Sequence, residues 1–128
     1  MAILNRLTHK RQAQNHAKGF EMSYEKIIIA GNVGKAEVLH SGAGNPYFRM
    51  SVAVNRKSGD QKETIWYSVL MYGKLGENVE GLKARYTVGR RVLVEGRPQA
   101  DAFIRKDGSA GLERTIIAQA YPELLDAP

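Results

Sequence analysis

The chain has 128 residues, of which 43% are hydrophobic and 25% are charged, proportions typical of one compact globular domain. It contains no cysteine, which excludes disulfides, thiol nucleophiles and thiolate metal sites, and its three scattered histidines lead us to expect no metal and no cofactor. Lysine and arginine number 19 against 13 acidic residues, and this net charge of +6 indicates a polyanionic partner without identifying it.

Residues 1–21 form a basic N-terminal segment with neither strand alternation nor a sustained helical stripe. The segment is too short and too polar to span a membrane, so we expect no membrane association. We interpret it as a flexible extension. Two alternatives stay open, because a basic segment with almost no acids also suits a mitochondrial transit peptide or an arm that contacts nucleic-acid phosphates.

From Met22 the sequence changes to short β-like runs separated by turn residues, and we expect one domain over residues 22–121. Residues 26–30 form a β-branched run that ends in a glycine-containing bend or bulge at 31–34 and continues at 37–40. A loop rich in glycine follows at 41–46. From Phe48 to Asn55, apolar residues alternate with polar or small ones, which predicts a half-buried strand.

Residues 64–72 predict a third strand that is apolar or aromatic on both faces, with Trp66 and Tyr72 on the same face. Residues 74–83 are the one good helix candidate, and the glycines within them predict that the helix is short. Residues 91–95 predict a strand that is left through Gly96. Residues 99–105 and 112–119 then flank a hairpin turn at 106–109, and Pro122 is expected to close the ordered part, leaving 122–128 as a short end.

Five strands with one short helix between the third and the fourth match the element order of an OB-fold, a five-stranded Greek-key barrel. The strand pattern alone fits several small β-barrels, and the position of the helix favours this one. We therefore predict an all-β fold of the OB type.

No set of residues has a catalytic arrangement. Residues 31–34 follow a strand but lack both a dinucleotide-binding fingerprint and a P-loop lysine, and 42–44 lie between strands rather than before a helix. No serine, histidine and aspartate have the spacing of a triad. We expect that the protein is not an enzyme.

Basic and aromatic residues are interleaved in the middle of the chain, where residues 46–114 hold 13 basic and 8 acidic residues. Bases without a complementary strand expose faces on which aromatic side chains can stack, and adjacent cations neutralise phosphates. Trp66, Tyr72 and Phe103 are the aromatic candidates. Each could instead pack in the core or within its hairpin, so the residues alone leave open nucleic-acid binding and a protein-interaction barrel.

Residues 26–120 resemble the bacterial and mitochondrial single-stranded DNA-binding protein family. The similar segments are KIIIAGNVG at 26–34, TIWYSVLMYGKL at 64–75 and GRRVLVEG at 89–96, with Phe103 ahead of an Asp-Gly hairpin. The resemblance implies non-specific binding and protection of single-stranded DNA during replication, recombination or repair, by a homotetramer in the bacterial cytoplasm or nucleoid, on phage or plasmid DNA, or in mitochondria.

By the same resemblance, Trp66, Tyr72 and Phe103 stack on bases. The cations expected to contact phosphates are Arg56, Lys62, Lys74, Arg97 and Arg105. The chain departs from the family at Lys57, in a turn that often carries a further tryptophan, and at its end, where two acids replace an acidic recruiting tail. We therefore expect no recruitment of replication enzymes through such a tail. Family members without the tail resemble the mitochondrial, phage and plasmid versions. The alternatives are a primosome-type adaptor resembling PriB, whose main role is protein interaction, and binding of duplex DNA or RNA.

Overall fold

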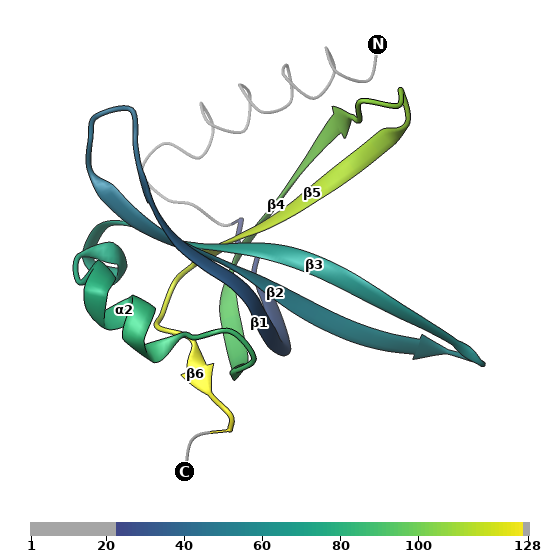
Figure 1. Cartoon of the computed structure of the whole chain (residues 1–128), viewed down its shortest axis with the longest axis horizontal. Coiled ribbons are helices and arrows are strands. Elements are labelled where there is room, and N and C mark those ends of the chain that lie inside the picture. The colour runs from purple at the N-terminus through teal and green to yellow at the C-terminus, as the bar shows by residue number, and fades with distance from the viewer. Residues whose placement is uncertain (1–22, 127–128) are drawn as a thin grey trace.

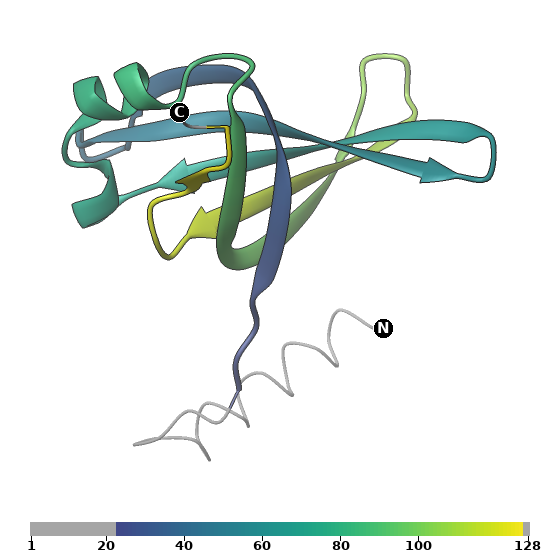
Figure 2. The same ribbon diagram turned by 90° about the horizontal axis from the view of Figure 1, so that it is seen from below.

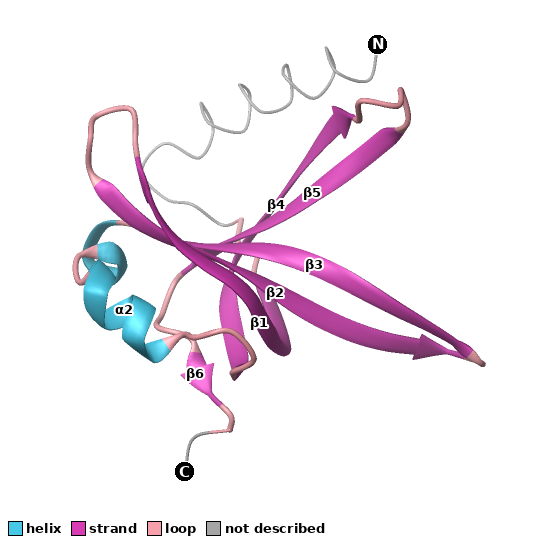
Figure 3. Ribbon diagram, in the orientation of Figure 1, coloured by secondary structure: helices cyan, strands magenta, loops and turns pink. Residues whose placement is uncertain are grey.

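A computed structural model of the chain describes residues 23–126 (Figure 1). Residues 1–22 and 127–128 lie outside the described part, and with them the expectations for the basic segment 1–21. Strands dominate the described residues (Figure 3). In chain order, the elements are β1 (Ile27–His40), β2 (Pro46–Ser58), β3 (Gln61–Met71), the 3-10 helix η1 (Gly73–Gly76), α2 (Val79–Arg85), β4 (Arg91–Ile104), β5 (Ala110–Ala118) and β6 (Glu123–Leu124).

The first five strands close into a ring. Antiparallel pairing joins β1 to β2 and β2 to β3, β3 then runs parallel to β5, and β5 pairs antiparallel with β4. β4 returns to β1 and closes the barrel, since Ile29 of β1 lies opposite Val94 of β4. The order β1-β2-β3-β5-β4 is that of an OB-fold, so the predicted fold class is confirmed. The β2–β3 and β4–β5 hairpins extend beyond the ring as two arms (Figures 1 and 2).

The core follows from the strand alternation predicted for residues 48–55. Phe48, Met50 and Val52 alternate with less buried residues along β2, and all three are fully buried. Tyr86, just after α2, covers one end of this core with its ring centroid 6.2 Å from that of Phe48. The Tyr86 hydroxyl donates to the carbonyl of Pro122 at 2.7 Å, so this buried polar group is satisfied.

The helical region differs from the prediction of one helix over residues 74–83. It is divided into η1 and α2, and the Asn78 side chain caps α2 by accepting a hydrogen bond from the Gly81 amide at 3.0 Å. The 3-10 helix η1 ends at Gly76, and Asn78, with the non-helical backbone of an N-cap residue, begins α2. Neither helix of residues 23–126 has the length and apolarity needed to cross a membrane.

Strand β4 also differs, because it continues through Gly96 where the sequence predicted an end. At Gly96 the strand changes partners, from Ile27 of β1 on one side to Ala118 of β5 on the other. A Cβ atom at this position would collide with the backbone oxygen of Ile117. The glycine therefore marks a close approach of two backbones within a bent strand rather than a strand end.

Beyond Pro122 the chain forms a short strand, β6, that the sequence did not predict. Leu124 pairs with Val92 of β4. The Asp126 carboxylate then accepts hydrogen bonds from the Arg91 amide and from Nε of Arg90, both at 3.1 Å. These bonds favour the charged form and lower the pKa of the Asp126 carboxyl. The end of the chain is thus attached to the outside of β4.

Candidate nucleic-acid interface

The three predicted stacking residues are all exposed on the outside of the barrel. Ile65, Val69 and Met71 of β3 point into the core, so the intervening Trp66 points outward and is 53% exposed. Phe103 on β4 is 45% exposed, and Tyr72, which directly follows β3, is 44% exposed. None of the three is a core residue.

Trp66 and Phe103 meet in one shallow groove, although 36 residues separate them in the sequence. The groove crosses β5, which lies between their strands in the sheet. Its lining residues are Arg49, Trp66, Ser68, Phe103, Leu112, Glu113 and Arg114.

Each of these two rings lies against a glycine of another strand, with Trp66 reaching across β2 to β1 and Phe103 lying against the adjacent β5. A Cβ atom at Gly34 of β1 would lie 2.7 Å from Cη2 of Trp66, and one at Gly111 of β5 would lie 2.8 Å from Cε2 of Phe103. Contacts this short cannot exist, so a side chain at either position would displace the ring. The glycines therefore allow both rings to settle close to the sheet.

We expect Gly34→Ala to weaken binding of single-stranded DNA by moving the indole of Trp66, by no more than the roughly 1–3 kcal/mol that one stacked base contributes. Fluorescence anisotropy with labelled oligo-dT measures the affinity. Gly42→Ala is the matched control, because a Cβ atom there meets nothing within 4 Å. Equal affinities for the two variants would show that the glycine does not position Trp66.

Tyr72 and Lys74 lie in a second hollow, beyond the end of β3. The Tyr72 ring packs against Tyr47 of β2, with ring centroids 4.7 Å apart. Burial, followed by the adjacent Tyr47 hydroxyl, raises the pKa of Tyr72, so the phenol stays neutral at physiological pH. This hollow therefore offers an uncharged aromatic surface beside the ammonium of Lys74.

The predicted cations of the β2–β3 arm point to opposite sides. Lys57 pairs with Lys62 and Arg56 with Glu63 in the strand register, and successive residues face opposite ways. Lys57 and Lys62 share the side of Trp66, whereas Arg56 lies on the other side and forms an ion pair with Glu63 at 3.4 Å. Two like charges placed opposite each other favour an anion between them, which adds Lys57 to the candidates.

Two further predicted cations are Arg97, within β4, and Arg105, which directly follows it. The Arg105 guanidinium lies 5.4 Å from the centroid of the Phe103 ring and donates to the carbonyl of Ala110. Arg97 is exposed six residues before Phe103, hence on the same side of the strand. Over residues 23–126, ion pairs involve neither these two arginines nor Lys62 and Lys74.

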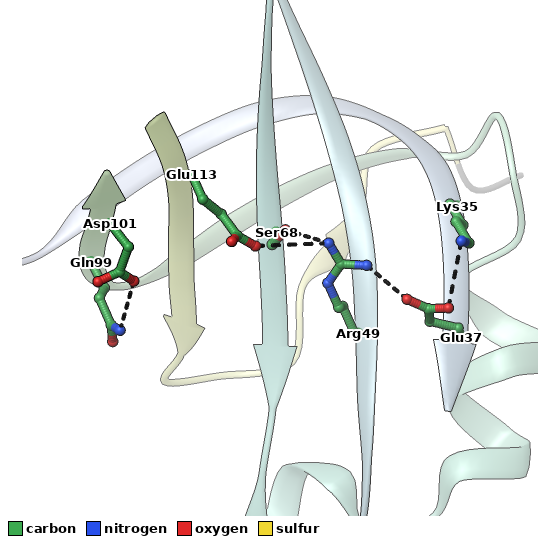
Figure 4. Close-up of polar contacts among 7 residues, drawn as sticks. All are labelled: Lys35, Glu37, Arg49, Ser68, Gln99, Asp101 and Glu113. Atoms are coloured by element: carbon green, nitrogen blue, oxygen red, sulfur yellow. Dashed lines mark hydrogen bonds and ion pairs between the residues drawn. The ribbon is translucent and has the colours of Figure 1, made fainter. Parts of the chain in front are cut away.

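A row of polar side chains crosses the outer face beside Trp66, and sequence reasoning missed it (Figure 4). Arg49 of β2 donates from Nη1 to Glu37 at 2.7 Å and from Nη2 to Ser68 of β3 at 2.9 Å. Its Nη2 also lies 3.9 Å from a carboxylate oxygen of Glu113, and Lys35 lies 3.6 Å from Glu37. The Arg49 hydrogen bond lowers the pKa of the Glu37 carboxyl. The polar residues at alternating strand positions indicated that these side chains are exposed, but not that they contact one another across the strands.

Residues 23–126 contain no group of three or more histidine, aspartate or glutamate side chains placed to hold a metal ion. The surface instead combines exposed rings, unpaired cations and one polar row.

Known proteins resemble this chain in sequence. A family model described as the single-strand binding protein family matches residues 24–124. The single-stranded DNA-binding protein of Xanthomonas campestris is 32% identical over 99 residues, which cover 73% of this chain and 56% of the relative. The mitochondrial single-stranded DNA-binding protein RIM1 of Saccharomyces cerevisiae is 27% identical over 103 residues, 80% of this chain and 73% of that protein. The chain thus spans about half the length of the Xanthomonas relative.

Solved structures share the fold. The small single-stranded DNA-binding protein from Streptomyces coelicolor has a TM-score of 0.61 and 26% identity, covering 77% of this chain and 93% of that one. The mitochondrial protein Rim1 of Saccharomyces cerevisiae has a TM-score of 0.57 and 27% identity, and the match covers 84% of this chain and 100% of that one. The Plasmodium falciparum SSB in complex with single-stranded DNA has a TM-score of 0.61 at 24% identity, covering 83% and 98%.

Proposed function

Because this chain belongs to the single-strand binding protein family, we propose that it binds and protects single-stranded DNA without sequence preference. Proteins of this family bind DNA and are not enzymes. We assign the binding to the domain of residues 22–121. We propose that it serves DNA replication, recombination or repair. The relatives include a mitochondrial protein, so the sites of action we propose are the bacterial cytoplasm or nucleoid, phage or plasmid DNA, and the mitochondrion.

The observation that carries the proposal is the pair of exposed rings in one groove. Trp66 and Phe103 offer two stacking surfaces to unpaired bases, and Tyr72 offers a third beyond the end of β3. A stacked base contributes about 1–3 kcal/mol, and stacking requires no particular sequence because every base has an aromatic face. A duplex hides these faces, so the geometry favours single strands.

The cations around the groove supply the phosphate contacts of the proposal. Lys62 and its register partner Lys57 lie on the side of Trp66, and Lys74 lies beside Tyr72. Arg97 lies on the same side of β4 as Phe103, and Arg105, just after the strand, lies beside the Phe103 ring. For Arg56 the support is weaker, because it faces away from Trp66 and pairs with Glu63. Contacts of this kind make the affinity fall steeply with salt concentration.

A competition assay tests the function. Labelled oligo-dT bound to the protein is challenged with unlabelled oligo-dT or with a duplex of the same length. We expect the single strand to displace the label at far lower concentration than the duplex, and the affinity to fall linearly in a log–log plot against salt. Equal competition by the duplex would contradict the proposal. Weak, salt-independent binding would favour an adaptor resembling PriB.

We also propose that the chain works as a homo-oligomer, with a tetramer expected from the family. The proposal rests on the family, because a single exposed apolar side chain such as Ile28 is ordinary on a protein surface. Light scattering coupled to size-exclusion chromatography gives the mass directly, and a monomeric mass with and without oligo-dT would contradict this assembly.

A further inference from the structure

We propose that Glu113 selects the base that lies between Trp66 and Phe103, favouring bases with an exocyclic amino group over thymine. The inference rests on the proposed function and deepens it, because it gives one position of an otherwise unselective surface a chemical preference.

Glu113 occupies the middle of the groove. The parallel register of β3 and β5 places Tyr67 opposite Arg114. Trp66 and Glu113 are the residues just before these two, so they lie next to each other on the outer side of the sheet. Phe103 approaches from the other side of β5, where its register partner is Gly111, two residues before Glu113. The Glu113 carboxylate therefore lines the groove between the two rings.

The carboxylate oxygens of Glu113 can accept hydrogen bonds from a ligand. Its side chain is 52% exposed, and the one ion pair that it forms within residues 23–126 is with Nη2 of Arg49, at 3.9 Å. That distance exceeds a hydrogen bond, and Arg49 also donates to Glu37 at 2.7 Å and to Ser68 at 2.9 Å. Asp101 of β4 is the register partner of Glu113 and adds a second carboxylate to this side of the sheet.

A carboxylate at this place determines which part of the nucleic acid can lie there. It repels phosphate, so a strand in the groove places a base edge, not its backbone, against Glu113, while phosphates lie nearer to the arginines of the lining and to the cations beyond it. Ionised carboxylates only accept hydrogen bonds. The exocyclic amino group of cytosine, adenine or guanine can donate to it, as glutamate accepts from cytosine N4 in duplex recognition. Thymine offers one imide N–H flanked by two carbonyl oxygens, and both oxygens are repelled by the carboxylate.

The test compares two pyrimidines, so that ring size and stacking area are matched. Dissociation constants for oligo-dC and oligo-dT of equal length are measured in one buffer for the wild type, E113Q and E113A. Glu80→Gln on α2 is the control, because it removes one exposed carboxylate outside the groove. Comparing the dC-to-dT affinity ratio of each variant with that of the wild type cancels differences in flexibility between the oligonucleotides.

We expect E113Q and E113A to lower the preference for dC relative to dT by about three- to tenfold, the net range of one hydrogen bond that competes with water. E80Q should keep the wild-type ratio. If E113Q and E113A bind both oligonucleotides more tightly by the same factor, Glu113 merely repels phosphate and the inference is overturned. Unchanged ratios with tight binding would also overturn it while leaving the proposed function intact. A wild type that binds neither oligonucleotide would instead refute the proposed function.

Discussion

Trp66→Ala is expected to weaken binding of oligo-dT by about 1–3 kcal/mol while the protein stays folded. The indole is 53% exposed on the outer face of β3, so its removal takes away a stacking surface and little core contact. Fluorescence anisotropy with labelled oligo-dT gives the affinity, and a thermal melt shows whether the fold is retained. The affinity of Trp66→Phe should lie between those of the wild type and Trp66→Ala, because a smaller ring still stacks.

Tyr24→Ala is the matched control for this variant. Tyr24 is 75% exposed and lies before β1, away from the residues that line the groove. Its removal should leave the affinity within about 0.5 kcal/mol of the wild type, the usual range for surface substitutions. Equal affinity of Trp66→Ala and the wild type would remove the central residue of the proposed site, and a Trp66→Ala variant that does not fold would reassign the indole to the core.

Phe48→Ala is expected to have the largest effect on stability, lowering the free energy of unfolding by about 3–5 kcal/mol. Phe48 is fully buried in β2, faces Tyr86 and pairs with Met71 in the register of β3, so truncation leaves a cavity in the centre of the barrel. Urea denaturation followed by circular dichroism measures the loss.

Ile104→Ala provides the comparison for stability, because this side chain is 76% exposed on the β4–β5 arm. Its free energy of unfolding should change by no more than about 0.5 kcal/mol. If Phe48→Ala cost no more than Ile104→Ala, the residues that form the core would have been misassigned.

Much of the fold could be predicted from local patterns. The alternation from Phe48 to Asn55 identified the buried face of β2, and the turn at 106–109 holds Gly108 at a φ of 87°, which glycine adopts without strain. The bend of β4 at Gly96 and the strand β6 could not be predicted in this way, because they depend on contacts with strands distant in sequence, which carry no local signal. The break between η1 and α2 does have a local signal, the N-cap Asn78, which the prediction of one helix over residues 74–83 did not use.

In the candidate site, too, some features follow from local sequence and others depend on the folded barrel. Exposure of Trp66 and Phe103 agrees with the sequence-based prediction, but their shared groove depends on β5 lying between β3 and β4, which only barrel closure decides. Likewise Arg49 and Glu113 approach each other across β3. The opposite directions of Arg56 and Lys62 follow from the register of the β2–β3 arm, which a charge count does not contain. Stacking and phosphate contacts by these residues stay predictions until binding is measured.

The most direct test of base stacking uses the intrinsic fluorescence of the protein, because Trp66 is its single tryptophan. Oligo-dT is titrated into the full chain at low salt, and emission from the indole is followed to saturation. Stacking of a base on Trp66 predicts strong quenching, reversed when salt is added. An unchanged emission at oligo-dT concentrations that saturate binding would contradict the central role given to Trp66.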